Sequence, residues 1–380
     1  MNVFITGAAA TKFGELWGTS PKALAREAFD NAIKDSGLDK KNVEALFVGN
    51  MLSGILGGQV NLGALFAEDL GLTNVAAFHI EGAGASGGMA VHTAVNSVLS
   101  GQYKTVAVLG VEKMTDYDSE IIARAQTGAG SDEERKSGVT FVGLYAILAR
   151  DYMQKYGVAQ EELAAVPVKN HFHASLNPSA QFHHLLIIAA VMKSPLVADP
   201  LKLLECAPVS DGAAALIITN IKGGVEIIAS EVATDSLALA QRKSLTELEA
   251  TQIAARKAYN KSGFGPKDID VAEVHDCFSI AEIIALEDLS FFAKGQGCGA
   301  ISKGQVTLGS SKHLTVNTSG GLKAAGDPVG ATGVRQIVEI VDQLKGRAGT
   351  RQVAGVKVGL AQNVGGSGAT VAIHILKNND

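Results

Sequence analysis

Short apolar runs alternate with amphipathic segments along the first hundred residues. Ser20 and Pro21 have the N-cap and first-turn preferences of a helix start, and that helix is predicted to end at Ser36-Gly37. Strands buried on both faces and separated by helices are typical of a parallel sheet covered on both sides. The runs predicted as such strands are Val3–Gly7, Val43–Val48, Val75–Ile80 and Thr105–Leu109.

The same order of elements returns after residue 222. Three landmarks correspond between the two parts of the chain, which indicates an internal duplication and two similar α/β layers packed back to back. The paired segments are Val43–Asn50 with Val271–Phe278, Phe78–Gly88 with Val316–Gly326, and Val106–Met114 with Val358–Gly366.

The segment between the two repeats breaks this rhythm. We predict an N-terminal half formed by residues 1–114 and 206–222, a C-terminal half of residues 223–380, and an insertion of residues 115–205. The insertion contains a polar stretch, Gly128–Gly138, and several histidines. Long insertions on a rigid α/β scaffold commonly serve as lids or subunit contacts.

Composition narrows the classes of function. With 47% apolar and 19% charged residues among 380, the chain can bury a large core. A net charge of −5 without a basic run argues against nucleic-acid or anionic-membrane binding, and no apolar stretch approaches a membrane span. Three cysteines do not make a disulfide framework, and the start lacks a signal-peptide pattern, so we expect a cytoplasmic protein.

Five segments in this order and spacing resemble the thiolase superfamily. The resemblance implies the thiolase fold: two βαβαβαββ halves packed as α-β-α-β-α layers, with the insertion as a lid or loop domain. It also implies an acyl-CoA acyltransferase, which makes or cleaves a β-ketoacyl-CoA with coenzyme A as co-substrate and no covalently bound cofactor. The segments are Glu81–Gly88, Gly110–Met114, Pro208–Ala215, His275–Phe278 and Asn317–Gly333.

The His275-Asp276-Cys277-Phe278 motif is similar to that of sterol-carrier-protein-2-type and archaeal acetoacetyl-CoA thiolases, and Asn363–Gly368 agrees with this branch. The resemblance implies acid/base work for Cys277 and an oxyanion hole that includes His275. An inert buried thiol and a hydrogen-bonded core histidine are the structural alternatives. Backbone donors at Gly365 and Gly366, and substrate contacts from Ser236, His171 and Asn317, complete the implied site.

Two positions depart from the family pattern. Gly84 stands where the nucleophilic cysteine belongs, and Asp327 replaces the histidine of Gly-His-Pro. An introduced change or artefact would explain Gly84 alone, whereas natural divergence explains both, because an Asp would raise the pKa of a facing thiol. Asp327 is either a general base in an apolar pocket or a cap of the turn before Pro328. Ser86 is an unfavourable substitute nucleophile, since no histidine is placed to activate it.

The histidines of the insertion, His171, His173, His183 and His184, have no zinc-site spacing, and we predict no metal. They fit pocket lining or a subunit contact better.

Three functions stay open from the sequence. The first is thiolase-type C-acyl transfer with the nucleophile missing. The second is a retro-aldolase on a β-hydroxyacyl-CoA, which needs a base and an oxyanion hole but no acyl-enzyme; the lack of a tyrosine in the C-terminal motifs counts against a close match to known aldolases. The third is a non-catalytic CoA-ester-binding subunit. For all three the resemblance implies a dimer, expected to be a homodimer core, and a possible small zinc-ribbon/OB-fold partner.

Overall fold

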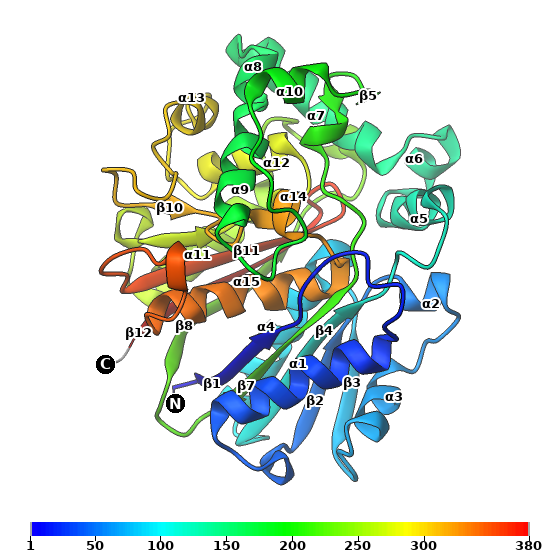
Figure 1. Ribbon diagram of the computed structural model, residues 1–380, viewed down its shortest axis with the longest axis vertical. Coiled ribbons are helices and arrows are strands. Elements are labelled where there is room, and N and C mark those ends of the chain that lie inside the picture. Colours follow the sequence, from blue (N-terminus) through cyan, green and yellow to red (C-terminus); the bar gives the residue numbers. More distant parts are fainter. Residues whose placement is uncertain (1, 379–380) are drawn as a thin grey trace.

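The computed structural model describes residues 2–378. The N-terminal half follows the predicted order of strands and helices, and closes with a strand after the insertion (Figure 1). Its elements are β1 (Phe4–Ala10), α1 (Pro21–Ser36), β2 (Ala45–Gly49), α2 (Ser53–Leu56), α3 (Leu62–Asp69), β3 (Ala76–Ile80), α4 (Ser86–Leu99), β4 (Thr105–Glu112) and β7 (Gly212–Thr219).

The C-terminal half repeats this plan. It begins with a long strand and ends in an antiparallel strand pair. Its elements are β8 (Val225–Thr234), α11 (Glu249–Ser262), β9 (Val271–Glu273), α12 (Ser279–Asp288), α13 (Gly297–Ser302), β10 (Thr315–Val316), α14 (Gly321–Ala325), α15 (Val329–Leu344), β11 (Val358–Gly365) and β12 (Thr370–Asn378).

The helix α1 shows how local sequence sets an element. The Ser20 hydroxyl accepts a hydrogen bond from the Ala23 N–H at 3.2 Å, Pro21 begins the helix, and Gly37 ends it at φ 67°. These bounds are the predicted ones. The apolar face of α1 packs on β1 and β7.

The sheet corrects one expectation. Strands β2, β3 and β4 are parallel to one another, and so are β9, β10 and β11, but β1, β7, β8 and β12 pair antiparallel with their neighbours. The predicted parallel pairing therefore holds for β2, β3 and β4 but was wrong for β1, and the whole sheet is mixed. The cause is that β11 returns directly into β12 as a hairpin, and β7 returns antiparallel beside β4 after the insertion.

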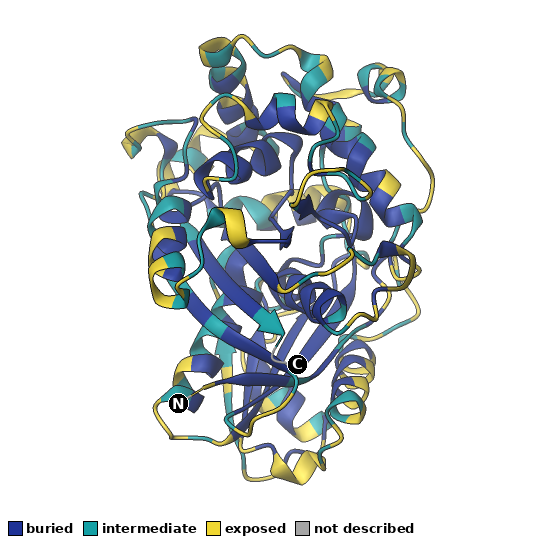
Figure 2. Cartoon of the chain, turned by 90° about the vertical axis from the view of Figure 1, so that its left-hand side faces the viewer, coloured by how far each residue is buried: buried dark blue, intermediate teal, exposed yellow. Residues whose placement is uncertain are grey.

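The two halves join edge to edge. The strand order is β10-β9-β11-β12-β8-β1-β7-β4-β2-β3, with β1 and β8 as the central antiparallel pair. Helices α4 and α15 pack on each other between the two half-sheets, α1 and α3 cover the outer face of the first, and α11 and α12 that of the second. The predicted α-β-α-β-α layering is confirmed, with helices rather than bare sheets meeting at the centre. Figure 2 shows the strands and central helices buried, and exposed residues on the outer helices and loops.

The insertion lies against the C-terminal half, where α7 packs on α12 and α9 on α14 (Figure 1). Its elements are α5 (Ser119–Gln126), α6 (Asp132–Ser137), α7 (Phe141–Tyr156), α8 (Gln160–Leu163), α9 (Ala165–Ser175), α10 (Ile188–Lys193), β5 (Leu196–Ala198) and β6 (Leu201–Lys202). Within residues 2–378, no helix combines the length and the apolar character that crossing a bilayer requires.

Candidate active site

A strained turn connects β3 to α4. Ala83 adopts φ 51°, a left-handed conformation that is costly for a residue with a side chain. The Ser86 hydroxyl accepts from the Gly82 N–H at 3.0 Å and donates to the Ala83 carbonyl at 2.7 Å. Ser86 is fully buried, and its hydroxyl is engaged in holding the turn together. This side chain stabilises the elbow and is not presented as a nucleophile.

Gly84 lies at the head of α4 and lines a small cavity of about 30 Å³, room for one or two water-sized groups. A Cβ atom added at Gly84 would lie 2.5 Å from the Val364 carbonyl oxygen and 3.3 Å from His275 Nε2. The first distance is below van der Waals contact with a backbone atom. The chain is thus packed against a glycine here, and a larger residue requires β11 to move.

His275 presents an N–H to position 84. The Asn363 Nδ2 group donates to the Gly84 carbonyl at 2.9 Å and to His275 Nδ1 at 3.2 Å, while Asn363 Oδ1 accepts from the Gly88 N–H at 3.0 Å. The Gly88 N–H fixes the orientation of the amide, so Nδ1 is an acceptor and the neutral ring carries its proton on Nε2. Burial, with the charge of Arg335, lowers the pKa of His275 to about 3. The imidazole is therefore a neutral hydrogen-bond donor aimed at position 84.

Asp327 lines the same cavity, between α14 and α15. Its backbone N–H donates to the Ser210 hydroxyl at 2.9 Å, and its carboxylate accepts from the Thr332 hydroxyl at 2.7 Å. Burial raises the pKa of Asp327 to about 6, against the opposing effects of Thr332 and Arg335. A carboxylate with a pKa close to neutral is suited to take and return a proton.

Cys277 completes the polar lining, beside a tyrosine that the sequence did not point to. Burial, and then the negative charge of Asp327, raises the pKa of the Cys277 thiol well above its usual value. Tyr145 on α7 interacts with this thiol and donates to the Gly366 carbonyl at 3.0 Å; burial raises its pKa too. Both groups are protonated near neutral pH. The aromatic pair Phe141 and Tyr145, four residues apart on one helix face, was the available signal.

Several predicted residues lie elsewhere. The Asn317 amide donates to Glu282 at 2.8 Å and accepts from the Val274 N–H at 2.8 Å, fully buried behind the site. His171 stacks on Phe182, with Nδ1 3.0 Å from the His184 carbonyl oxygen. The cavity lining includes none of Asn317, His171, Ser236 and Gly365, whereas Gly84, His275, Cys277, Asp327 and Gly366 meet there.

His173 of the insertion uses both ring nitrogens in hydrogen bonds that hold the fold together. His173 bonds the Asn317 carbonyl through Nδ1 at 2.9 Å and accepts from the Leu308 N–H through Nε2. Within the described part of the chain, no group of three His, Cys, Asp or Glu side chains is arranged to hold a metal ion.

Comparison with known protein families identifies the family to which this site and fold belong. The profile described as "Thiolase, N-terminal domain" matches residues 3–222, and "Thiolase C-terminal domain-like" matches residues 231–378. The chain belongs to the thiolase family. The resemblance and the fold inferred from the motifs are thereby confirmed.

Relatives within this thiolase family fall into the predicted branch. An acetyl-CoA acetyltransferase of Methanothermobacter thermautotrophicus is 44% identical, over 98% of this chain and 99% of its own. Sterol carrier protein 2 of Rattus norvegicus is 35% identical, over 97% of this chain and 71% of its own. A solved structure described as "Ltp2-ChsH2(DUF35) aldolase" has a TM-score of 0.83 at 25% identity, over 98% of this chain and 97% of its own. The family is thus one of acyl-CoA acyltransferases.

Proposed function

We propose that this thiolase-family protein binds an acyl-CoA thioester and cleaves the Cα–Cβ bond of a β-hydroxyacyl-CoA by a retro-aldol step. One observation carries the proposal. A carboxylate with a raised pKa and a neutral imidazole N–H line a cavity beside a residue that has neither a side chain nor space for one. This arrangement suits proton transfer and oxyanion stabilisation without an acyl-enzyme.

In this step Asp327 removes the proton of the β-hydroxyl group. The O–H electrons form the new carbonyl, the Cα–Cβ bond breaks, and its electrons pass into the thioester as an enolate. His275 Nε2–H donates to the enolate oxygen, with the Gly366 backbone as the expected second donor. A proton then returns to Cα from protonated Asp327, either directly or through the Cys277 thiol, which Asp327 reprotonates. The products are an aldehyde or ketone and a shortened acyl-CoA, so atoms and charge balance.

The relatives support the substrate class. The 44% identical relative is an acetyl-CoA acetyltransferase, and the structural relative of TM-score 0.83 is an aldolase. Coenzyme A is accordingly proposed as the carrier of the acyl group, with no covalently bound cofactor.

The missing nucleophile favours a second candidate, in which the chain is a CoA-ester-binding subunit without turnover. Thiolytic cleavage or Claisen condensation of a β-ketoacyl-CoA, the reaction type of the acetyltransferase relatives, would need a cysteine at position 84. The structure argues against this thiolase reaction, because the Val364 carbonyl leaves no room for a Cβ at position 84.

Two kinds of protein partner are also proposed. Strand β3 is an end strand of the sheet, and Phe78 on it is 40% exposed, which suits a homodimer contact. The aldolase relative, Ltp2-ChsH2(DUF35), includes a DUF35 component, which supports the expectation of a small zinc-ribbon/OB-fold subunit. The domain bounds 1–114 with 206–222, 115–205 and 223–380, and the cytoplasmic location, likewise stay predictions.

Product analysis separates these functions. The protein is incubated with a chain-length series of β-hydroxyacyl-CoA esters, and in parallel with β-ketoacyl-CoA plus free CoA, and the CoA esters are identified by mass spectrometry. We expect a shortened acyl-CoA and a carbonyl product from the hydroxy esters alone. CoA-dependent cleavage of the keto esters would identify a thiolase. Saturable binding of both ester series without products would identify the non-catalytic subunit.

A further inference from the structure

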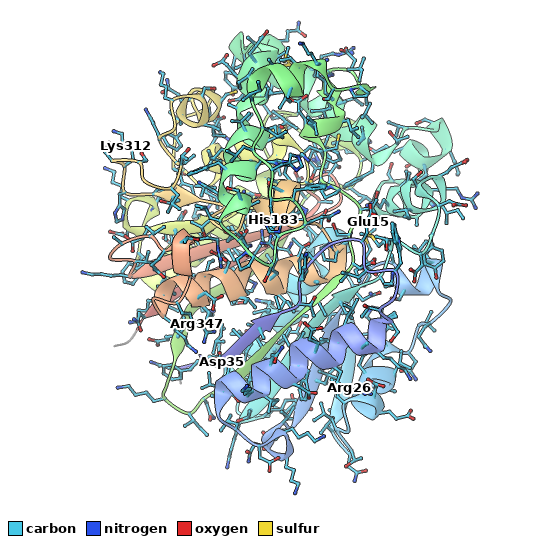
Figure 3. All side chains as sticks on the ribbon, viewed as in Figure 1. Glu15, Arg26, Asp35, His183, Lys312 and Arg347 are labelled. Atoms are coloured by element: carbon cyan, nitrogen blue, oxygen red, sulfur yellow. The ribbon has the colours of Figure 1, made fainter. Side chains whose placement is uncertain are left out.

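A second cavity lies along α15 and shares no lining residue with the active-site cavity. It has a volume of about 390 Å³ and is formed by β1, α1, α15 and the loop around Asn177. Its rim carries Asp35 on α1 and Arg347 after α15, which lie close together in Figure 3. Three arginines line it: Arg335, Arg347 and Arg351.

Two of these arginines are paired with carboxylates. Arg351 holds Glu339 through two hydrogen bonds of 2.9 and 3.2 Å. Arg347 bonds Asp35 at 3.0 Å and Asp342 at 2.6 Å. Their charges are therefore balanced by side chains within the cavity wall.

Arg335 is different. It is 7% exposed, and none of its three guanidinium nitrogens makes a hydrogen bond to the protein. It forms an ion pair with Glu273, but the two groups are 3.7 Å apart, beyond hydrogen-bond distance, and that carboxylate already accepts from the backbone and hydroxyl of Ser319. The guanidinium otherwise lies 5.7 Å from the ring centre of Phe13. Burying a cation with its five N–H donors unused is costly unless an anion comes to it.

We propose that this cavity binds a small oxyanion, a carboxylate or a phosphoryl group, with Arg335 as its cationic partner. The planar fork of a guanidinium matches both kinds of group, and hydrogen bonds between charged partners are about twice as strong as neutral ones. The exposed Asn31 amide and Ser179 hydroxyl at the cavity wall offer neutral donors for the body of such a ligand.

An anion bound at Arg335 would also change the pKa values of groups in the catalytic cavity. The charge of Arg335 lowers the pKa of Asp327 and of His275. An anion on Arg335 would offset that charge, so the pKa of Asp327 would rise and the pH at which it ionises would move upward. This second part rests on the proposed role of Asp327 as the base, whereas binding itself does not.

Calorimetric titration of the full chain tests the binding without any turnover. The probes are inorganic phosphate and acetate, each at constant ionic strength adjusted with chloride. We expect saturable binding that Arg335→Gln weakens by at least about tenfold and that Arg256→Gln, at an exposed arginine on α11 outside the cavity, leaves within about threefold. Preference for phosphate or for acetate identifies the group that the site takes. Equal affinity in wild type and Arg335→Gln, or heat that chloride reproduces, would overturn the proposal.

Circular dichroism checks that Arg335→Gln folds. If it does not, Arg335→Lys keeps the charge but loses the planar fork, and we expect it to bind several-fold more weakly than wild type. Unchanged affinity in Arg335→Lys would then contradict the assignment. Activity plays no part in these outcomes, so failure of the retro-aldolase proposal would leave the binding result readable.

Discussion

The two halves of the chain share a topology strand for strand, yet they contribute unequally to the site. The C-terminal half supplies His275, Cys277 and Asp327, whereas the N-terminal half supplies Gly84 and Met51, neither of which titrates. Two buried carboxylates, Glu112 of the N-terminal half and Asp327 of the C-terminal half, differ in the same way. Glu112 accepts from the Asn50 side chain and from the N–H groups of Met51, Leu52 and Gly330, so it fastens loops together.

Asp327 instead has one side-chain donor, Thr332, and faces the cavity. A duplicated scaffold therefore fixes where functional groups can stand, but not which half carries them. In this chain the turn between β3 and α4 in the N-terminal half contributes backbone but no reactive side chain. The acid/base groups lie in the C-terminal half.

Among the changes that test this difference between the two halves, we expect the largest effect at Asp327. Asp327→Asn removes the base, so kcat/KM for a β-hydroxyacyl-CoA should fall by about 10²–10⁴. In the wild type kcat/KM should rise with pH through about 6, where Asp327 ionises, and this limb should vanish in the variant. Steady-state kinetics against pH measure both. Asp30→Asn, an exposed change on α1, is the control, and an unaltered pH limb in Asp327→Asn would remove Asp327 from the mechanism.

His275→Ala comes next. Loss of one preorganised oxyanion donor costs about 10²–10³ in kcat, and the loss should be largest in kcat because the donor acts on the developing enolate. His313→Ala, an exposed histidine of the same half, should be silent. A change confined to KM would show that His275 only binds substrate.

Gly84→Ala tests whether the first half has closed around its glycine. The added Cβ meets the Val364 carbonyl at 2.5 Å, and overpacking of this kind costs about 1–3 kcal/mol of unfolding free energy. Gly299→Ala on α13 is the matched control, because a Cβ there meets nothing within 4 Å. Urea denaturation measures both variants. A Gly84→Ala protein as stable as wild type would mean that the elbow still has room for a side chain.

The smallest effect is a pH dependence of stability. The folded-state pKa of Asp327, about 6, lies above the ordinary aspartate value of 3.8, so its ionisation opposes folding, and the stability present below pH 4 is lost as pH rises through 6. Asp327→Asn cannot ionise. Its Tm should therefore exceed that of wild type by about 1–3 °C at pH 7.5 and by less at pH 5, as measured by calorimetry. The opposite trend would show that the ionised carboxylate is stabilised in the fold.

Most of the fold could be predicted from the sequence because local signals agree with it. The Ser20-Pro21 start and Gly37 end of α1 follow from capping chemistry alone, and the paired landmarks correspond to β2 with β9, β3 with β10 and β4 with β11. The antiparallel strands β7 and β12 were not anticipated as such, since strand direction depends on the path of the connection and not on apolar pattern.

Less of the active site than of the fold could be predicted from the sequence. The motifs pointed to His275, Cys277 and Asp327, but the tautomer of His275 depends on Asn363, 88 positions away. Tyr145 and Gly366 are 221 positions apart, and only the packing of α7 on the C-terminal half joins them. The placement of Asn317 away from the cavity also needed the fold, because a motif residue can bind substrate or brace the loops behind it.

Intact-protein mass spectrometry during turnover tests the central claim most directly, because it reports whether the chain passes through an acyl-enzyme. The protein is quenched at short times with a β-hydroxyacyl-CoA that it cleaves, beside a Gly84→Cys variant given a β-ketoacyl-CoA. We predict product formation with the unmodified mass of the chain. An acyl adduct on the unaltered protein that forms and decays at the rate of turnover would contradict it.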